Sequence, residues 1–188
     1  MSAPPDVPAI VERAFEVSRR AGYVSFCRNE TGRLLAALAA TRNGTMAEFG
    51  TGCGVGTAWL RSGARPGAMI LSAELDQKLA VAAQVIFTDD AQVEVLSADW
   101  STLRNKGPYS LLFLDPSSPE DASVDAVADL VEPGGIVVMD DFAPCEMWPP
   151  ITMGRVDVLR ETWLTDPRFT SVEVMVAPDA SALIATRN

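Results

Sequence analysis

The chain has 188 residues, of which 48% are apolar, and this suffices for one sizeable hydrophobic core but is short for two full domains. Its formal net charge of −10 would repel a phosphate backbone over most of the surface, so we expect no nucleic-acid substrate. The absence of histidine excludes a Ser-His-Asp triad, a histidine general base and a histidine-ligated zinc ion.

The three cysteines, Cys27, Cys53 and Cys145, are far apart and form no CxxC pair. This pattern fits neither a disulfide framework nor a zinc site and favours reduced thiols. The first residues carry no basic segment followed by an apolar run, and no segment approaches the roughly 18 apolar residues of a membrane span. We expect a soluble, cytoplasmic protein.

The N-terminal part predicts two helices. Apolar side chains recur at helical spacing over residues 6–20, and a second helix is expected over 30–41 with Leu34, Leu35 and Leu38 on one face. We treat residues 1–44 as a helical preface that belongs to the same domain as residues 45–188.

From residue 45 onward, apolar segments alternate with helical ones. Strands are predicted at 45–49, 68–73, 93–96, 109–114 and 135–139, and helices at 58–64, 76–87, 122–131 and 153–164. Strands that are apolar on both faces and alternate with helices indicate a parallel sheet covered on both sides. The last two strands, 170–176 and 182–185, are separated by a turn too short for a parallel pair. We therefore expect an α/β fold with five parallel strands and a C-terminal antiparallel hairpin.

A glycine-rich loop follows the first predicted strand, in the segment Glu48-Phe49-Gly50-Thr51-Gly52-Cys53-Gly54. Its glycines let the main chain turn tightly and approach a ligand. The spacing departs from the dinucleotide fingerprint G-x-G-x-x-G, and no lysine follows as a phosphate loop requires, which disfavours a nicotinamide-dependent oxidoreductase. An acid beside the loop would repel a pyrophosphate yet suits the cationic amino group of a methionine moiety.

With this acid-x-G-x-G-x-G pattern, the chain resembles the class I S-adenosylmethionine-dependent methyltransferases, and within them the catechol O-methyltransferase-like small-molecule O-methyltransferases. The resemblance covers nearly the whole chain. It is also carried by Glu74 after the second strand, by Ala98-Asp99-Trp100 after the third, by Phe113-Leu114-Asp115, by residues 130–141, which resemble "LxxGGxxxxDN", and by the lead-in at 28–35. It implies a single Rossmann-like, doubly wound domain with strand order 3-2-1-4-5-7-6, in which residues 45–188 bind S-adenosylmethionine.

The resemblance implies a cofactor site in which Glu74 binds the ribose hydroxyls, Asp99 the exocyclic amine and Trp100 the adenine ring. The implied cofactor-binding residues are Glu48, Gly50, Thr51, Gly52, Gly54, Glu74, Leu75, Ala98, Asp99, Trp100 and Asp115. Other roles stay open for several of them. Glu48 could be a salt-bridged strand-end acid, Glu74 or Asp99 a helix N-cap, Trp100 a core residue and Cys53 a small filler.

Three carboxylates, those of Asp115, Asp140 and Asp141, end adjacent predicted strands. Such hard oxygen ligands suit Mg²⁺ or Ca²⁺. In the resembled family, an Asp after the fourth strand and an Asp-Asn pair after the fifth hold a divalent ion that orients a catechol. Two departures weaken the parallel, because the Asn is Asp141 here and residues 116–120 lack the lysine that serves as base. The same acids could instead cap loops or touch the cofactor.

The implied reaction is an in-line methyl transfer from sulfonium to a hydroxyl of a small, aromatic molecule. No general base is identified, since Lys106 precedes its strand and should lie at the far end. Bulky residues at Tyr23 and Phe26, and Met147 and Trp148 within 142–150, could cover the acceptor or pack a homodimer contact. The alternatives are an N-methyltransferase and a cofactor-binding scaffold without turnover.

Overall fold

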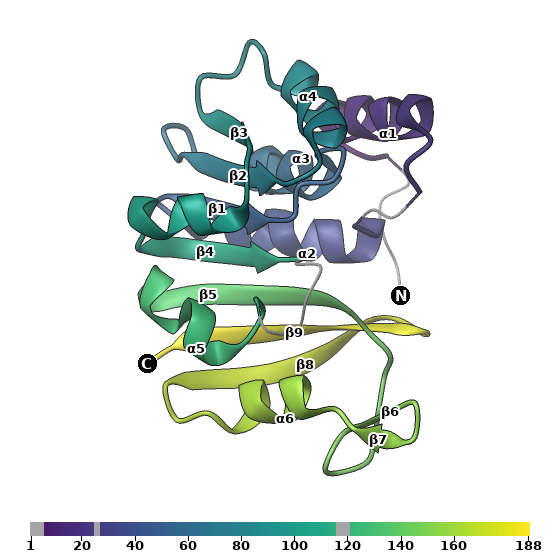
Figure 1. Cartoon of the computed structure of the whole chain (residues 1–188), viewed down its shortest axis with the longest axis vertical. Helices are drawn as coiled ribbons and strands as arrows, with labels where there is room; N and C mark the ends of the chain where they lie inside the picture. Colours follow the sequence, from purple (N-terminus) through teal and green to yellow (C-terminus); the bar gives the residue numbers. More distant parts are fainter. Residues whose placement is uncertain (1–5, 25–26, 116–120) are drawn as a thin grey trace.

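The fold is built around one large sheet. Figure 1 shows the computed structural model of the chain, which describes residues 6–24, 27–115 and 121–188. The seven-stranded sheet contains β1 (Met46–Phe49), β2 (Ile70–Glu74), β3 (Val93–Ser97), β4 (Tyr109–Leu114), β5 (Val131–Phe142), β8 (Phe169–Ala177) and β9 (Ala180–Arg187). Their order is β3-β2-β1-β4-β5-β9-β8. Counted along the chain within this sheet, that is the predicted order 3-2-1-4-5-7-6.

The direction of each strand also agrees with the prediction. Strands β1 to β5 pair in parallel, whereas β9 runs antiparallel to both β5 and β8. All residues of β1 and β4 are buried, as expected for central strands covered on both faces. The doubly wound α/β fold is therefore confirmed.

Helices cover the two faces of the sheet separately (Figure 1). Helices α1 (Ala9–Ala21), α2 (Asn29–Ala39), α3 (Val55–Gly63) and α4 (Gln77–Ile86) share one hydrophobic cluster with one face. The short helices η1 (Trp100–Lys106), α5 (Val124–Val127), η2 (Ala128–Leu130) and α6 (Val158–Thr165) pack on the other. Of the helices within the described ranges, none has the length and apolar character needed to cross a membrane.

The helix predicted at 122–131 is too long at both ends. Only α5 and one turn of η2 are helical, and Val131 already belongs to β5, where it is fully buried and pairs with Tyr109. The strand predicted at 135–139 is accordingly longer, running from Val131 to Phe142 with an irregular register. Burial of Val131 in the sheet outweighed the helical pattern of the residues before it.

The helix predicted at 153–164 begins too early. Residues 151–156 form a hairpin of β6 (Ile151–Thr152) and β7 (Arg155–Val156), and α6 follows with Asp157 as its N-cap. Met153 and Gly154 occupy the turn with φ values of 51° and 76°. Two successive residues with positive φ are typical of a tight hairpin turn, and of the two only Gly154 is a residue type that favours such a turn.

Trp163 anchors α6 to the sheet and offers a test of the packing. Its fully buried indole donates a hydrogen bond of 2.7 Å to the carbonyl of Ala122 and packs edge-on against Phe169. Trp163→Phe keeps most of the ring volume but leaves that carbonyl without its donor. We expect the free energy of unfolding to fall by about 2 kcal/mol, measured by urea denaturation. An unchanged free energy would mean that the hydrogen bond contributes nothing.

Candidate functional site

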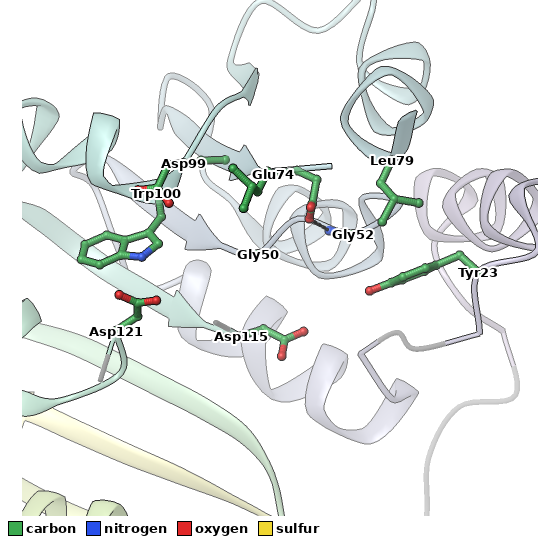
Figure 2. A pocket seen from close by; sticks show the side chains of 11 residues that line it. Tyr23, Gly50, Gly52, Glu74, Leu79, Asp99, Trp100, Asp115 and Asp121 are labelled. Carbon is green, nitrogen blue, oxygen red and sulfur yellow. Dashed lines mark hydrogen bonds between the residues drawn. The ribbon is translucent and has the colours of Figure 1, made fainter. Parts of the chain in front are cut away.

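A cavity that we call the main cavity of the site lies at the carboxyl ends of the parallel strands, where the strand order reverses between β1 and β4. Ligands of open α/β sheets bind at such a switch point. The cavity has a volume of about 280 Å³. Figure 2 shows the side chains around it, which belong to Tyr23, Gly50, Gly52, Ala73, Glu74, Leu75, Leu79, Asp99, Trp100, Asp115 and Asp121.

The glycine loop forms the floor of this cavity. Gly50 has a φ of 94°, and a Cβ at this position would lie 2.2 Å from the carbonyl oxygen of Asp115. Gly52 has a φ of 51°, and its Cβ would lie 2.9 Å from the ring of Tyr23. Both positions therefore need glycine for conformation and for space. Gly54 differs, because its hypothetical Cβ faces Ala83, Ile86 and Phe87, so this glycine serves the contact between α3 and the end of α4.

Glu74 is held at the rim of the cavity by two main-chain amides. One carboxylate oxygen accepts a hydrogen bond of 2.8 Å from the amide of Gly52, and the other accepts one of 2.9 Å from the amide of Asp76. Glu74 is not a helix N-cap, a role that Asp76 fills for α4. Each carboxylate oxygen can accept more than one hydrogen bond, so Glu74 is still able to bind a hydroxyl pair.

Asp99 and Trp100 close the opposite end of the cavity from Tyr23 (Figure 2). Asp99 is the N-cap of η1 and accepts a hydrogen bond of 2.9 Å from the amide of Ser101. Hydrogen bonding from the side chain of Ser101, followed by that from its amide, lowers the pKa of the Asp99 carboxyl. The Trp100 ring stacks on Phe49 with 4.9 Å between centroids. Asp99 is thus an N-cap and Trp100 packs on the core, and both residues also line the cavity. These structural roles therefore do not exclude cofactor binding.

Glu48 is buried beneath the loop and forms no ion pair among the described residues. It is 2% exposed, and one of its oxygens accepts hydrogen bonds from the hydroxyls of Thr57 and Ser72. Ser72 in turn is hydrogen bonded to Thr51 of the loop. Burial, aided by the charge of Asp115, raises the pKa of Glu48 to about 8, against the opposing effect of the hydroxyl donors.

This pKa predicts a specific pH dependence of stability. The unfolded chain ionises Glu48 near 4.5, whereas the folded chain retains the proton until about 8, so the stability associated with protonated Glu48 is lost as the pH rises between these values. Relative to Glu48→Gln, the wild-type free energy of unfolding should fall by about 1.4 kcal/mol per pH unit across this window. Parallel urea titrations of both proteins at several pH values would reveal it, and parallel curves would contradict it.

The three candidate metal ligands lie close enough to influence one another. Burial, followed by the charges of Asp141, Asp140 and Glu74, raises the pKa of Asp115 to about 6. Asp140 accepts a hydrogen bond of 2.8 Å from the hydroxyl of Thr31, a partner that the sequence did not suggest. Asp141 has a φ of 64° at the irregular end of β5. Within the described part of the chain, no three His, Cys, Asp or Glu side chains form a group that could hold a metal ion.

A second, much smaller cavity of about 10 Å³ lies behind the loop at the Tyr23 end. Glu48 and Thr51 line this cavity and not the larger one. Asp115 and Tyr23 line both. The predicted methionine end of the cofactor site is therefore where the two cavities meet.

Sequence reasoning placed most but not all of the lining. Leu75 lines the main cavity and is 72% exposed, whereas Ala98 does not line it and instead donates from its amide to the carbonyl of Glu74. Ala73, Leu79 and Asp121 were missed. Leu79 belongs to the predicted helix 76–87, but the sequence does not show which residues of this helix face the cavity. No sequence pattern marks Asp121.

The segment 142–150, which the sequence suggested as a cover for the methyl acceptor, does not lie at this site. No residue of that segment lines either cavity as far as the described residues show, and Met147 and Trp148 are 59% and 63% exposed. Tyr23, by contrast, lines the cavity as expected. Phe26 and residues 116–120 lie outside the described residues.

Comparison with solved structures finds proteins of similar fold. An O-methyltransferase from Bacillus cereus in complex with SAH aligns with a TM-score of 0.75 and 19% identity over 97% of this chain and 93% of that one. The O-methyltransferase TomG from Streptomyces achromogenes in complex with SAM gives 0.75 and 19% over 97% and 92%. The SAH-bound methyltransferase PaMTH1 from Podospora anserina gives 0.74 and 21% over 97% and 89%.

The chain matches no model of a protein family and no curated protein sequence. The structural likeness extends over nearly the whole chain, including the helical preface and the C-terminal hairpin, yet the identities are low. The chain therefore has the Rossmann-like fold of these cofactor-bound methyltransferases.

Proposed function

We propose that this chain is an S-adenosylmethionine-dependent methyltransferase that acts on a hydroxyl of a small molecule. The observation that carries the proposal is the order of groups along one cavity, from Trp100 and Asp99 through Glu74 to Gly52 and Tyr23 (Figure 2). The aromatic ring of Trp100 and the acid Asp99 match the adenine, the carboxylate of Glu74 matches the ribose, and the glycine loop matches the methionine part of the cofactor. Solved structures of the same fold hold SAM or SAH, which supports this assignment.

A dinucleotide fits the same cavity poorly. A pyrophosphate needs main-chain amides that are free to donate and surroundings without negative charge. Here the amide of Gly52 already donates to Glu74, and Asp115 lines the same wall. A nicotinamide-dependent oxidoreductase is thus disfavoured by charge as well as by glycine spacing.

The chain's contribution to catalysis is positioning. In-line transfer requires the acceptor oxygen to approach the sulfonium methyl from the side opposite the sulfur, and fixing that geometry can account for much of the acceleration. The described wall nearest the methionine end carries the carboxylate of Asp115, whereas Glu48 beneath the loop keeps its proton up to a pH of about 8. An anionic acceptor would be repelled there, so the acceptor arrives neutral or cationic. That acidity also makes an amine acceptor the second candidate.

A divalent ion is the part of the family resemblance that the donor set does not support. Within the described residues, the carboxylates do not form a group that could hold a metal ion. Turnover that is unaffected by EDTA and retained in Asp140→Ala is the expected result, and loss of turnover with EDTA that Mg²⁺ restores would overturn it.

Transfer of a labelled methyl group tests the proposal directly. The purified protein would be incubated with labelled S-adenosylmethionine and a panel of catechols, phenols and amines, with Glu74→Gln as the matched negative control. Methylated hydroxyl products in the wild-type reaction alone support the proposal. Products from amines alone would favour an N-methyltransferase, and cofactor binding without any product would favour a scaffold.

A further inference from the structure

The indole of Trp100 lies at the end of the main cavity that the proposed function assigns to the base of the cofactor. It stacks on Phe49 with 4.9 Å between the ring centroids and 25° between the ring planes. Phe49 is fully buried in β1 and also meets the ring of Tyr109 edge-on at 6.5 Å. The stack therefore ties the indole to the central strands of the sheet.

The guanidinium of Arg104 covers the same indole. Its central carbon lies 4.9 Å from the centroid of the Trp100 ring, and one of its NH₂ groups donates a hydrogen bond of 3.1 Å to the carbonyl of Ala126 in α5. A guanidinium over an aromatic face is attracted to it, and the hydrogen bond to Ala126 fixes where this one stands. Arg104 is exposed and lines neither cavity. The indole is thus contacted by one residue of the core and by one of the surface.

The main chain of η1, which carries both Trp100 and Arg104, is anchored without help from the guanidinium. Leu103 is fully buried, and its carbonyl accepts a hydrogen bond of 2.5 Å from the hydroxyl of Tyr109. Asp99 caps the start of η1 through the amide of Ser101. Loss of the Arg104 side chain should therefore free the indole without displacing η1.

The orientation of the indole decides which part of it the base can meet. Figure 2 shows the pyrrole part, which carries the nitrogen, toward the cavity and the benzene part away from it. Contacts with Phe49 and Arg104 leave less of the indole face for a third planar group. Asp99 lines the same end of the cavity, and its carboxylate accepts but does not donate hydrogen bonds. An exocyclic amine suits this carboxylate, whereas a carbonyl oxygen in the same place is repelled.

We infer that Arg104 is a positioning residue of the cofactor site. It holds the indole of Trp100 against Phe49, so that the pyrrole edge meets the base and directs the exocyclic amine of adenine toward Asp99. Arg104 thereby sets the preference for adenine over a base without that amine. The inference rests on the proposed function and extends it to a side chain that lies outside the cavity.

A comparison of two ligands isolates this effect. In S-inosylhomocysteine, a carbonyl oxygen replaces the exocyclic amine of S-adenosylhomocysteine, and the dissociation constants of both would be measured by calorimetry for wild type and Arg104→Ala. The wild type should prefer S-adenosylhomocysteine by at least about tenfold. Arg104→Ala should weaken S-adenosylhomocysteine binding about fivefold and leave the other ligand nearly unchanged, so the preference falls by about the same factor.

Arg65→Ala is the matched control. Arg65 is also exposed, donates a hydrogen bond of 2.8 Å to a main-chain carbonyl, that of Ala40, and lines neither cavity. Its removal changes the net charge by the same amount and should leave both dissociation constants unchanged.

Two results for Arg104→Ala would overturn the inference. Equal weakening of both ligands would mean that Arg104 acts only through charge or through the stability of η1, and unchanged constants would mean that Phe49 alone holds the indole. Equal binding of both ligands by the wild type would overturn it as well, because there would be no preference to set. All three outcomes leave the proposed function intact, whereas failure of the wild type to bind S-adenosylhomocysteine overturns both.

Discussion

Gly50→Ala should abolish measurable cofactor binding and destabilise the fold. The backbone at Gly50 has a φ of 94°, which costs a residue with a Cβ about 1–2 kcal/mol. The new Cβ would also lie 2.2 Å from the carbonyl oxygen of Asp115, a main-chain atom that cannot rotate away. The loop and the end of β4 must therefore separate. We expect the free energy of unfolding to fall by about 2–4 kcal/mol and the dissociation constant for S-adenosylhomocysteine to rise at least about 100-fold.

Gly67→Ala separates backbone strain from collision. Gly67 has a φ of 88°, close to that of Gly50, but a Cβ there would meet nothing within 4 Å. This variant should lose only the strain energy, about 1–2 kcal/mol, and should bind the cofactor as the wild type does. Thermal melting and calorimetry on both variants make the comparison. Equal cofactor affinity in Gly50→Ala and Gly67→Ala would show that the contact between the loop and Asp115 does not shape the site.

Glu74→Gln should weaken cofactor binding strongly although it changes few atoms. Both carboxylate oxygens of Glu74 accept hydrogen bonds from main-chain amides, those of Gly52 and Asp76. A glutamine has one acceptor oxygen, so its NH₂ group would face one of these amide donors, and the loop or the rim must move. The ribose also loses a charged acceptor. We expect the dissociation constant for S-adenosylhomocysteine to rise about 30- to 100-fold.

Glu94→Gln is the matched control for this substitution. Glu94 lies on the neighbouring strand β3, is exposed and pairs with Lys106. An exposed ion pair contributes little, so this variant should retain wild-type affinity and stability. Calorimetry on the two variants at one ionic strength tests the difference. If both weaken binding equally, net charge and not the position of Glu74 controls affinity.

The alternation of strands and helices and the cofactor edge could be predicted because they depend on local patterns, whereas the strand order was implied by the resemblance to a known family. Apolar runs such as 109–114 directly indicate buried parallel strands, and the glycine spacing at Gly50 and Gly52 indicates a loop whose main chain approaches a ligand closely. The positions that follow, at Glu74 and Asp99, are set by strand ends, which the same runs define. Local sequence was therefore sufficient for this side of the site.

Features that depend on contacts between distant segments could not be predicted. Val131 looks helical until its pairing with Tyr109 is known, and Thr31 carries no sign that it will bind Asp140, 109 residues later. Burial of Glu48 below the loop also follows only from the packing of α3 and β2 around it. The metal site at Asp115, Asp140 and Asp141 stays a prediction, because strand ends bring carboxylates near one another but do not fix their geometry.

Tyr23 illustrates the same limit from the opposite direction. The sequence suggested only that Tyr23 could cover the methyl acceptor. Its place against Gly52 results from the end of α1, where Gly22 and Ser18 fix the turn. A single aromatic residue between two helices has no periodic signal. Only the three-dimensional arrangement identifies the atom that faces the cavity.

Calorimetric titration of the purified protein with S-adenosylhomocysteine tests the central claim most directly. The cavity at the switch point should bind one molecule per chain with a dissociation constant on the order of micromolar. Gly50→Ala should lose this binding and Glu74→Gln should weaken it about 30- to 100-fold, while Gly67→Ala and Glu94→Gln keep it. No heat with S-adenosylhomocysteine or S-adenosylmethionine, from a protein that melts cooperatively, would contradict the account.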